Sequence, residues 1–220
     1  MARLSPVSVQ HERAEDGDAV VRPLPVGRRD EELAAGLRAG EPWARAALFD
    51  RYAPATERVL RRLLGPESHG DLADLVQEVF VQALSSLDRL RDDRALPAWM
   101  RTITTRTAYR AIRSYRARRW LRFWEPGDLP ELEVRGVDPE LSQAYHCTYR
   151  LLQRMPTAER IAFVLRHVEK LELRDVAQAC DVSLATIKRR LARAQQRFAR
   201  AAARDPVLNT WLKEGGRWTS

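Results

Sequence analysis

Apolar residues recur at helical spacing through most of the chain, and no segment alternates apolar and polar positions as a half-exposed strand would. The clearest repeat follows Asp71, where apolar positions advance in steps of three and one and trace a single stripe along one helix. That stripe predicts a buried face, formed by Leu72, Leu75, Val76, Val79, Phe80, Ala83, Leu84 and Leu87. We therefore predict an all-α protein.

Proline, glycine and breaks in the apolar repeat divide the chain into domains and connections. The N-terminal stretch has no apolar period and contains Pro23 and Pro25, which is typical of a flexible tail. A central stretch loses the helical period and turns mostly acidic after Trp124, as an interdomain linker does. We expect two small helical domains joined by this flexible linker, with the segments 1–29 (tail), 30–118 (first domain), 119–140 (linker), 141–204 (second domain) and 205–220 (C-terminal tail).

The charge balance adds a candidate partner. The chain has 38 Lys+Arg against 30 Asp+Glu and a formal net charge of +8, which favours a polyanion such as nucleic acid. Only Lys170, Lys188 and Lys213 are lysines, so almost all the basic charge is arginine, whose fork matches phosphates and guanine edges. A GC-rich coding sequence would produce the same arginine excess, so composition alone leaves both explanations open.

Two windows concentrate the positive charge and contain no carboxylate. Residues 99–122 hold eight arginines, and residues 183–204 hold Lys188 and six arginines. A solvated helix normally mixes the signs of its charges, because opposite charges at positions i and i+4 support the helix. We therefore predict that both helices lie against nucleic acid, with a solvated basic face as the alternative.

The second window also has the spacing of a helix-turn-helix motif. A short helix is predicted over residues 173–180, a turn at Asp181 and Val182, and a second helix capped by Ser183. Apolar positions fix one face of the second helix, so its N-terminal half could enter a major groove. A plain helical hairpin is the alternative. The residues on the outward arcs are Ala185, Thr186, Lys188, Arg189, Arg190 and Arg193.

Two stretches carry a resemblance to a known family. Residues 74–80 (DLVQEVF), followed by 98–100 (AWM) and Ile103, resemble region two of bacterial sigma factors. Residues 151–156 (LLQRMP) and the helix-turn-helix containing residues 186–194 (TIKRRLARA) resemble region four. Because the two regions occur in this order with no third domain between them, the chain is similar to the extracytoplasmic-function (ECF) group of the sigma-70 superfamily.

The resemblance implies a factor that binds core RNA polymerase, directs it to a subset of promoters and assists strand opening without chemistry of its own. Its implied partners are core RNA polymerase, duplex promoter DNA upstream and a melted strand downstream. An anti-sigma factor is a further candidate partner. The expected location is cytoplasmic.

The resemblance also assigns roles to three groups of residues. A stripe beside the apolar one is predicted to bind the clamp coiled coil of the largest polymerase subunit, through Asp74, Gln77, Glu78 and Val81. A solvated acidic face is the alternative there. The first basic window is predicted to hold the minus-ten element and its unpaired bases, through Trp99, Arg106, Arg110, Arg113 and Arg116. The recognition helix is predicted to read the minus-thirty-five element, through Thr186, Lys188, Arg189, Arg190 and Arg193.

The chain departs from the family's pattern at three positions. Arg106 and Arg110 stand where many members have Asn and Asp, so the minus-ten preference is left open while polymerase binding is expected. Asp181 stands where the turn of the helix-turn-helix usually has Gly. Because Asp tolerates the left-handed backbone conformation better than most residues, we expect the turn to form.

Signals for other functions are weak. His146 and Cys147 are adjacent, so they point in different directions on a helix, and no phosphate-binding GxxxxGK[ST] or GxGxxG occurs. Two cysteines without CxxC spacing predict neither a disulfide framework nor zinc, and the longest apolar runs are too short for a membrane span. We expect no catalytic residue, cofactor or metal site.

Two rival classes remain open from the sequence. A stand-alone helix-turn-helix regulator that binds an operator as a dimer would explain only residues 141–204. A helical interaction protein would leave both basic windows unexplained.

Overall fold

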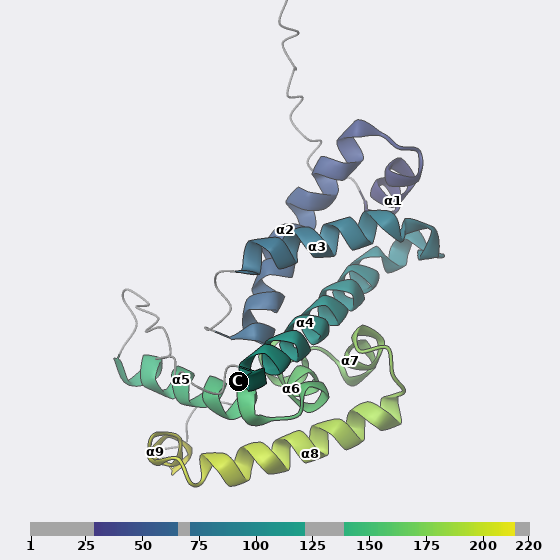
Figure 1. The fold of residues 1–220 in the computed structure, drawn as a ribbon. Coiled ribbons are helices and arrows are strands. Elements are labelled where there is room, and N and C mark those ends of the chain that lie inside the picture. Colours follow the sequence, from purple (N-terminus) through teal and green to yellow (C-terminus); the bar gives the residue numbers. More distant parts are fainter. Residues whose placement is uncertain (1–28, 66–70, 122–138, 214–220) are drawn as a thin grey trace, which may run out of the picture.

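The apolar stripe after Asp71 forms a helix in the computed structural model, labelled α3 in Figure 1. Its buried face includes Leu72, Val79, Phe80 and Ala83, whereas Leu84, which the stripe also predicted to be buried, is 38% exposed. The structure describes residues 29–65, 71–121 and 139–213. Within them the predicted all-α fold is confirmed. Most of the expected N-terminal tail and most of the expected linker lie outside the described residues. The helices are α1 (Asp30–Arg38), α2 (Pro42–Leu64), α3 (Leu72–Ser85), α4 (Leu96–Leu121), α5 (Pro139–Arg154), α6 (Thr157–Phe163), α7 (Leu173–Ala179), α8 (Leu184–Ala202) and α9 (Pro206–Lys213), with the short turns η2 (Leu87–Arg89), η3 (Asp93–Ala95) and η4 (Val164–Val168).

Helices α1 to α4 form the first half of the molecule, in which α2, α3 and α4 pack on one another. Pro42 lies in the first turn of α2, where its missing amide costs no helical hydrogen bond. The helix ends before Gly65, whose φ of 73° is in the left-handed region that glycine adopts without strain. On α4, the buried Thr104 donates its hydroxyl hydrogen to the Met100 carbonyl over 2.8 Å, so this polar group is satisfied inside the core.

Helices α5 to α9 form the second half. The short helix α7, the turn at Asp181 and Val182 and the long helix α8 make the predicted helix-turn-helix. Ile187, Leu191 and Ala194 bury one face of α8, as the apolar spacing predicted. The sequence pattern therefore identified both the motif and the face by which it is held.

The residues after Asp205 form a helix that the sequence pattern did not predict. Helix α9 packs against α5, and a small separate core forms between α5, α8 and α9 from Ala144, Cys147, Leu151, Ala202 and Leu208. The Asp205 carboxylate accepts hydrogen bonds from the amides of Val207 (3.1 Å) and Leu208 (3.2 Å), which caps the start of α9. It also pairs with Arg150 over 3.1 Å.

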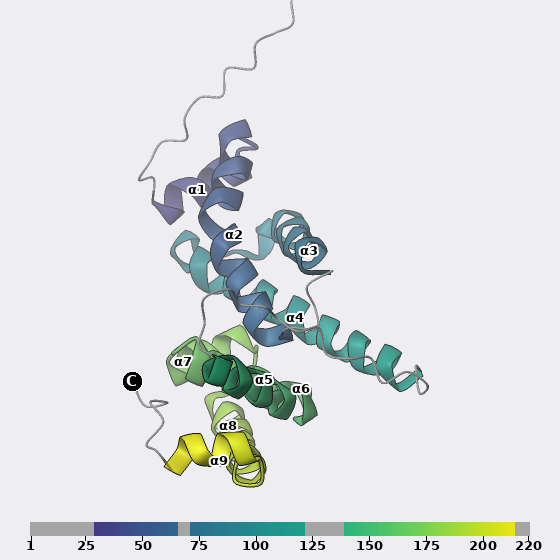
Figure 2. The same cartoon turned by 90° about the vertical axis from the view of Figure 1, so that its left-hand side faces the viewer.

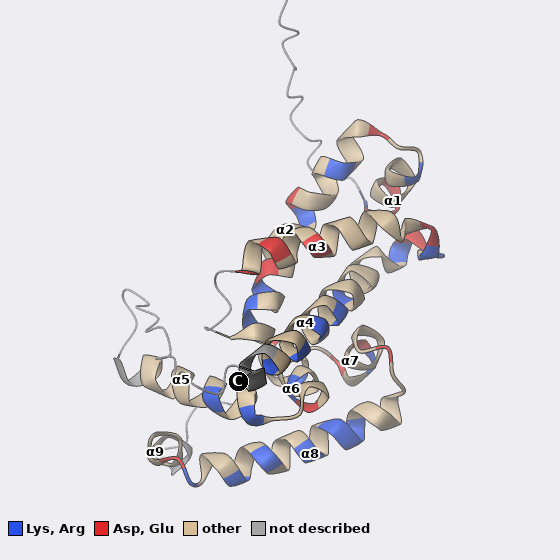
Figure 3. Ribbon diagram, in the orientation of Figure 1, with Lys and Arg blue, Asp and Glu red and all other residues tan. Residues whose placement is uncertain are grey.

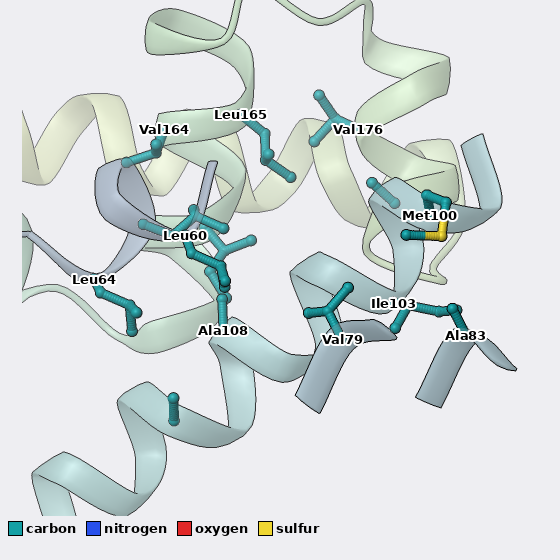
Figure 4. Close-up of a cluster of buried hydrophobic side chains, with 14 of the residues drawn as sticks. Leu60, Leu64, Val79, Ala83, Met100, Ile103, Ala108, Val164, Leu165 and Val176 are labelled. Atoms are coloured by element: carbon teal, nitrogen blue, oxygen red, sulfur yellow. The ribbon is translucent and has the colours of Figure 1, made fainter. Parts of the chain in front are cut away.

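The two halves share one continuous hydrophobic core. Helix α4 lies between the rest of the first half and helices α6 and α7 of the second (Figures 1 and 2). Figure 4 shows Leu60 and Ala108 of the first half in the same cluster as Val164, Leu165 and Val176 of the second. In this arrangement α4, the helix that carries the first basic window, is covered along one side by the helix-turn-helix half.

Candidate nucleic-acid and polymerase interfaces

Helix α8 carries exposed basic residues and no acidic residue. Figure 3 shows the blue Lys and Arg segments along its ribbon. Ser183 caps the helix as predicted, because its hydroxyl oxygen accepts a hydrogen bond from the Thr186 amide over 3.2 Å. The five residues predicted to read the minus-thirty-five element all lie off the buried face. Of these, Lys188, Arg189 and Arg193 are exposed, whereas Thr186 and Arg190 are half-buried.

One arginine of this helix is tied to the protein instead. The Nε of Arg197 lies 2.9 Å from Oε2 of Glu159 on α6, whose side chain is only 10% exposed. A buried carboxylate needs such a partner, because its charge is costly to remove from water alone. We therefore do not count Arg197 among the arginines of α8 that are available to bind a ligand.

The turn of the helix-turn-helix forms as expected, with Asp181 in the left-handed backbone conformation. Asp181 has a φ of 53°, in the left-handed region. Its neighbour Cys180 is half-buried, and burial raises the pKa of the Cys180 thiol to about 11. Because a thiol with such a pKa stays protonated near neutral pH, Cys180 is a packing residue rather than a nucleophile.

Helix α4 carries the predicted minus-ten residues. Trp99 is half-buried and packs against the core, while Arg106, Arg110, Arg113 and Arg116 are exposed. The guanidinium of Arg113 lies over the ring of Tyr109, 5.9 Å from its centroid. Among the aromatic side chains of this helix that the structure describes, Tyr109 is the most exposed, at 36%.

Three of these four arginines contact other parts of the chain. Arg106 pairs with Asp181 in the helix-turn-helix over 2.7 Å. Arg116 donates to the carbonyl oxygens of Gln153 (2.9 Å) and Met155 (2.6 Å), also in the second half. Arg110 pairs with Glu78 of α3 over 3.0 Å. The face of α4 that was predicted to bind DNA is therefore partly occupied by the protein's own carboxylates and carbonyls.

The predicted polymerase-binding residues lie together on the outer side of α3. Asp74 and Gln77 are exposed, Glu78 is half-buried, and Val81 is 57% exposed, the highest value among the large apolar residues that the structure describes. Besides Arg110, Glu78 accepts a hydrogen bond from Nε2 of Gln82 over 2.7 Å. The geometry thus provides an acidic strip with an apolar residue at one end.

This surface contains two exposed apolar residues that the sequence did not predict to be exposed. The apolar repeat placed Leu84 on the buried face of its helix, which is wrong, and Phe49 was not singled out. Leu84 is 38% exposed on α3, and Phe49 is 48% exposed on α2 with its ring 4.9 Å from that of Phe80. Phe49 follows the buried Leu48 within a short apolar run, so the pattern gave no sign that its side chain would face solvent. An exposed apolar patch beside acidic residues is typical of a protein-binding surface.

No group of three or more His, Cys, Asp or Glu side chains within the described residues is placed to hold a metal ion. Burial raises the pKa of the Cys147 thiol, as does the nearby Asp205 carboxylate, despite the opposing effect of Arg150. Burial, with help from Arg166 and Lys170, lowers the pKa of His167. In the described part of the chain, no helix combines the length and apolar character needed to cross a membrane.

Two separate family models match the two halves of the chain. Residues 48–119 match the family model for sigma-70 region 2, and residues 145–197 match that for sigma-70 region 4. The chain is 24% identical over 176 residues to the ECF RNA polymerase sigma-E factor of Escherichia coli K12, covering 76% of this chain and 91% of that protein. The sigma-E factor of Haemophilus influenzae is 26% identical over 176 residues, covering 76% and 92%.

Solved structures share the fold. The structure of CnrH in complex with the cytosolic domain of CnrY has a TM-score of 0.56 at 22% identity, covering 80% of this chain and 98% of that one. The sigma factor RpoE of Bartonella quintana, solved with the anti-sigma factor NepR, has a TM-score of 0.52 at 22% identity, covering 71% and 94%.

A region 2 followed by a region 4, each matched along its own half, defines a sigma-70-type transcription initiation factor. The chain belongs to the ECF group of that superfamily, as the sequence motifs indicated. It therefore binds RNA polymerase and directs initiation at specific promoters. Proteins of this family are regulatory factors of transcription initiation.

Proposed function

We propose that this ECF factor divides its contacts among three surfaces, with α3 for the polymerase clamp, α4 for the minus-ten element and α8 for the minus-thirty-five element. The observation that carries the proposal is the separation of charge. An acidic and apolar strip lies on α3, whereas the exposed charged residues of α4 are arginines and those of α8 are arginines and a lysine. Figure 3 shows acidic positions on α3 and basic positions along α4 and α8. The first domain is taken as residues 30–118 and the second as 141–204.

On α3, the proposed partner is the clamp coiled coil of the largest polymerase subunit. Val81 and Leu84 supply apolar area that a partner can desolvate, and Asp74 and Glu78 supply charge for a basic surface. Asp74 and Glu78 are four residues apart and repel each other by a few tenths of a kcal/mol on an isolated helix. A basic partner turns this repulsion into attraction, and Gln77 lies between the two carboxylates as a further polar contact.

On α4, the proposed ligand is the melted minus-ten strand. Taking a base out of the duplex stack costs a few kcal/mol. Stacking on an aromatic side chain returns about 1 to 3 kcal/mol per base. Tyr109 with Arg113 beside it is a ready platform of this kind, and the exposed Arg106, Arg110 and Arg116 supply charge for the backbone. The half-buried Trp99 can offer only part of its ring.

On α8, the proposed ligand is duplex DNA upstream. The helix is held from behind by Ile187, Leu191 and Ala194, so its exposed N-terminal half can enter a major groove without losing core contacts. The arginine fork suits both guanine edges and phosphates, which allows one helix to combine base reading and positioning.

Regulation and location complete the proposal. The Bartonella quintana relative was solved with an anti-sigma factor, which supports an anti-sigma factor as a partner of this chain also. Because its target polymerase acts on the chromosome, the proposed location is the cytoplasm. The proposed role in strand opening rests on binding energy alone and requires no catalytic group.

Site-specific photocrosslinking tests the three assignments together. A photoreactive phenylalanine analogue replaces Val81, Tyr109 or Arg189 in the reconstituted holoenzyme, which is bound to a promoter that the same holoenzyme has selected from genomic fragments. We expect crosslinks to the largest polymerase subunit from position 81, to the melted strand from 109 and to upstream duplex from 189. Position 32 on α1, which is exposed and outside the three surfaces, is the control. A crosslink from 81 to DNA, or from 109 to duplex only, would overturn the corresponding assignment.

A further inference from the structure

A hollow of about 510 Å³ lies where the C-terminal part of α2 meets α5 and η4. Figure 2 shows the lower end of α2 beside α5. At this junction Tyr149 of α5 donates its hydroxyl hydrogen to the Arg62 carbonyl over 3.1 Å, which ties the two helices together. Pockets that bind small molecules usually measure about 300 to 1,000 Å³. The hollow therefore has the size that a small molecule needs.

The wall formed by α2 is basic. Arg58, Arg61 and Arg62 line the hollow, and their spacing of i, i+3 and i+4 places them on one side of the helix. Arg61 pairs with Glu57, and Arg62 pairs with Glu169 over 2.7 Å. Arg58 is exposed and forms no ion pair with another described residue. These five side chains carry three positive charges and two negative ones, so the wall attracts an anion.

The wall formed by α5 is aromatic. Tyr145 and Tyr149 stand one turn apart, with ring centroids 4.5 Å apart and ring planes tilted by 50°. Tyr149 is buried, and its ring lies so close to Gly65 that a Cβ atom there would come within 2.7 Å of it. Tyr145 lines the hollow and is 39% exposed. Tyr149 thus fixes this wall, and Tyr145 offers a ring on which a planar group can stack.

A ligand that satisfies both walls carries an anionic group and a planar ring. Phosphate oxygens match the arginine fork. The Arg61 and Glu57 side chains are 49% and 47% exposed, and exposed ion pairs are weak, so a phosphate can replace Glu57 on Arg61 at little cost. A nucleobase stacks on an aromatic side chain whatever its hydrogen-bonding pattern, because every base has a π face. Both features occur together in a nucleotide.

The surroundings of the hollow favour a free nucleotide over a nucleic-acid strand. Proteins that bind single strands provide a basic groove that follows the backbone over several nucleotides. One turn before Arg58 on α2 and one turn before Tyr145 on α5, the exposed residues are the uncharged Pro54 and Leu141. The basic wall therefore does not continue along either helix as a track for a strand.

We propose that this hollow binds a nucleoside diphosphate, with its phosphates on Arg58 and Arg61 and its base against Tyr145. Arg62 stays with Glu169, whose side chain is only 10% exposed and needs a partner for its charge. The site uses none of the residues assigned to polymerase or promoter DNA. It is an additional binding site, and the proposed function of α3, α4 and α8 does not depend on it.

Calorimetric titration of the full chain with ADP and with GDP tests the site, because both carry the proposed groups. Guanosine, which lacks phosphates, and pyrophosphate, which lacks a ring, are the ligand controls. We expect each diphosphate to bind one-to-one and at least about 10-fold more tightly than either control. It should also raise the Tm, since it binds the folded state. The proposal is wrong if neither diphosphate binds at millimolar concentration, or if guanosine or pyrophosphate binds as tightly.

Two arginine variants test the basic wall. Arg58→Ala should weaken ADP binding about 3- to 10-fold, because it removes a charged hydrogen-bond donor from an exposed position. Arg45→Ala is the matched control, since Arg45 is an exposed arginine of α2 outside the hollow. It removes the same charge and should bind ADP as the parent does. Equal losses in the two variants would show a general attraction to positive charge and would overturn the site.

Three variants on α5 test the aromatic wall. Tyr145→Ala should weaken ADP binding about 5- to 30-fold through the loss of stacking, and should leave pyrophosphate binding unchanged. Tyr145→Phe keeps the ring and should bind ADP within about 2-fold of the parent. Leu141→Ala removes another exposed apolar side chain from α5 and should have no effect. If Tyr145→Ala binds ADP as the parent does, the base does not stack there and the proposal is wrong.

A fluorescein-labelled single strand of mixed sequence, followed by anisotropy, distinguishes a nucleotide site from a nucleic-acid surface. We expect Arg58→Ala and Tyr145→Ala to bind this strand as the parent does, at helicity matched by circular dichroism. If both variants lose affinity for the strand and the parent does not bind ADP, the hollow belongs to a nucleic-acid surface and the proposal is overturned.

Discussion

Arg110 of α4 donates a hydrogen bond to Oε1 of Glu78 on α3 over 3.0 Å, so a residue assigned to DNA is paired with one assigned to polymerase. Both side chains are about half exposed, at 56% and 44%. The pair also supplies the positive charge that offsets the repulsion between Glu78 and Asp74. The first half of the molecule therefore places its proposed DNA and polymerase surfaces side by side.

Reversing the acidic strip should remove polymerase binding without unfolding the protein. We expect Asp74→Arg with Glu78→Arg to weaken association with core polymerase by at least about 30-fold, since a buried interfacial charge pair is worth about 2 kcal/mol or more. Both side chains lie off the buried face of α3. Pull-down of core enzyme, at matched helicity by circular dichroism, measures this.

The control for that prediction is Glu32→Arg, a charge reversal at an exposed position on α1 outside the strip. It should bind core polymerase as the parent does. Equal recovery of core enzyme by the double variant and by Glu32→Arg would remove α3 as the polymerase contact.

Arginines of α4 should matter more for opening the promoter than for finding it. We expect Arg106→Ala and Arg110→Ala to reduce the reactivity of unpaired thymines to permanganate, while duplex binding by the holoenzyme changes little, because this helix acts on unpaired bases. A template with a pre-melted bubble should restore activity. Failure of the bubble to rescue these variants would show that the affected step is not strand opening.

Residues of the recognition helix should divide into two kinds. We expect Lys188→Ala or Arg189→Ala to cost about 1 to 3 kcal/mol and to relax preference at one upstream position. Arg190→Ala and Arg193→Ala should weaken all sequences alike and lower the salt slope by about one. Binding to a panel of single-base upstream variants at several salt concentrations distinguishes the two, and uniform losses for Lys188 and Arg189 would contradict direct readout by them.

Asp205 should stabilise the C-terminal helix in a pH-dependent way. Burial raises the pKa of this carboxyl, but the Leu208 amide and Arg150 outweigh burial and leave the pKa below its usual range. Its stabilising effect is therefore full above the ordinary value of about 4 and is lost as pH falls through the lowered pKa. We expect Asp205→Ala to cost about 0.5 to 2 kcal/mol at pH 7 by urea denaturation.

The comparison variant for Asp205 is Asn, which keeps a capping oxygen and loses the charge facing Arg150. It should fall between the parent and Ala at neutral pH, and the parent should approach Asp205→Asn in acid as its carboxylate is protonated, while the difference between the Asn and Ala variants, which do not titrate, stays the same. A difference between the parent and Asp205→Ala that is unchanged in acid would contradict the role of the charged carboxylate.

The sequence predicted the elements whose cause is local. The helix of the α3 stripe and the Ser183 cap of α8 each depend on residues within a few positions, and both are found, although Leu84 of the stripe is exposed. Helix α9 was missed because it is short and because it packs against residues that lie far away in the sequence, Cys147 and Leu151 of α5. A helix of two turns is specified by packing more than by its own sequence.

The same distinction between local sequence and long-range packing decides which features of the candidate site could be predicted. Its residue types and helical faces could be predicted, because periodicity fixes which side chains leave the core. The pairing of Arg106 with Asp181 and the contact of Arg116 with the Met155 carbonyl could not, because they depend on how two distant segments pack. Exposure of Phe49 likewise depends on how α3 packs against α2, where the Phe49 ring lies 4.9 Å from that of Phe80.

The measurement that tests the central claim most directly is transcription reconstituted from purified components. Core RNA polymerase, with or without this chain, transcribes genomic DNA of the encoding organism, and the 5′ ends of the products are sequenced. We predict transcripts that appear only with the chain, begin downstream of two unlike, regularly spaced sequence elements, and disappear with the Asp74→Arg, Glu78→Arg variant. Start sites that are the same with and without the chain, or a palindromic element bound without polymerase, would contradict it.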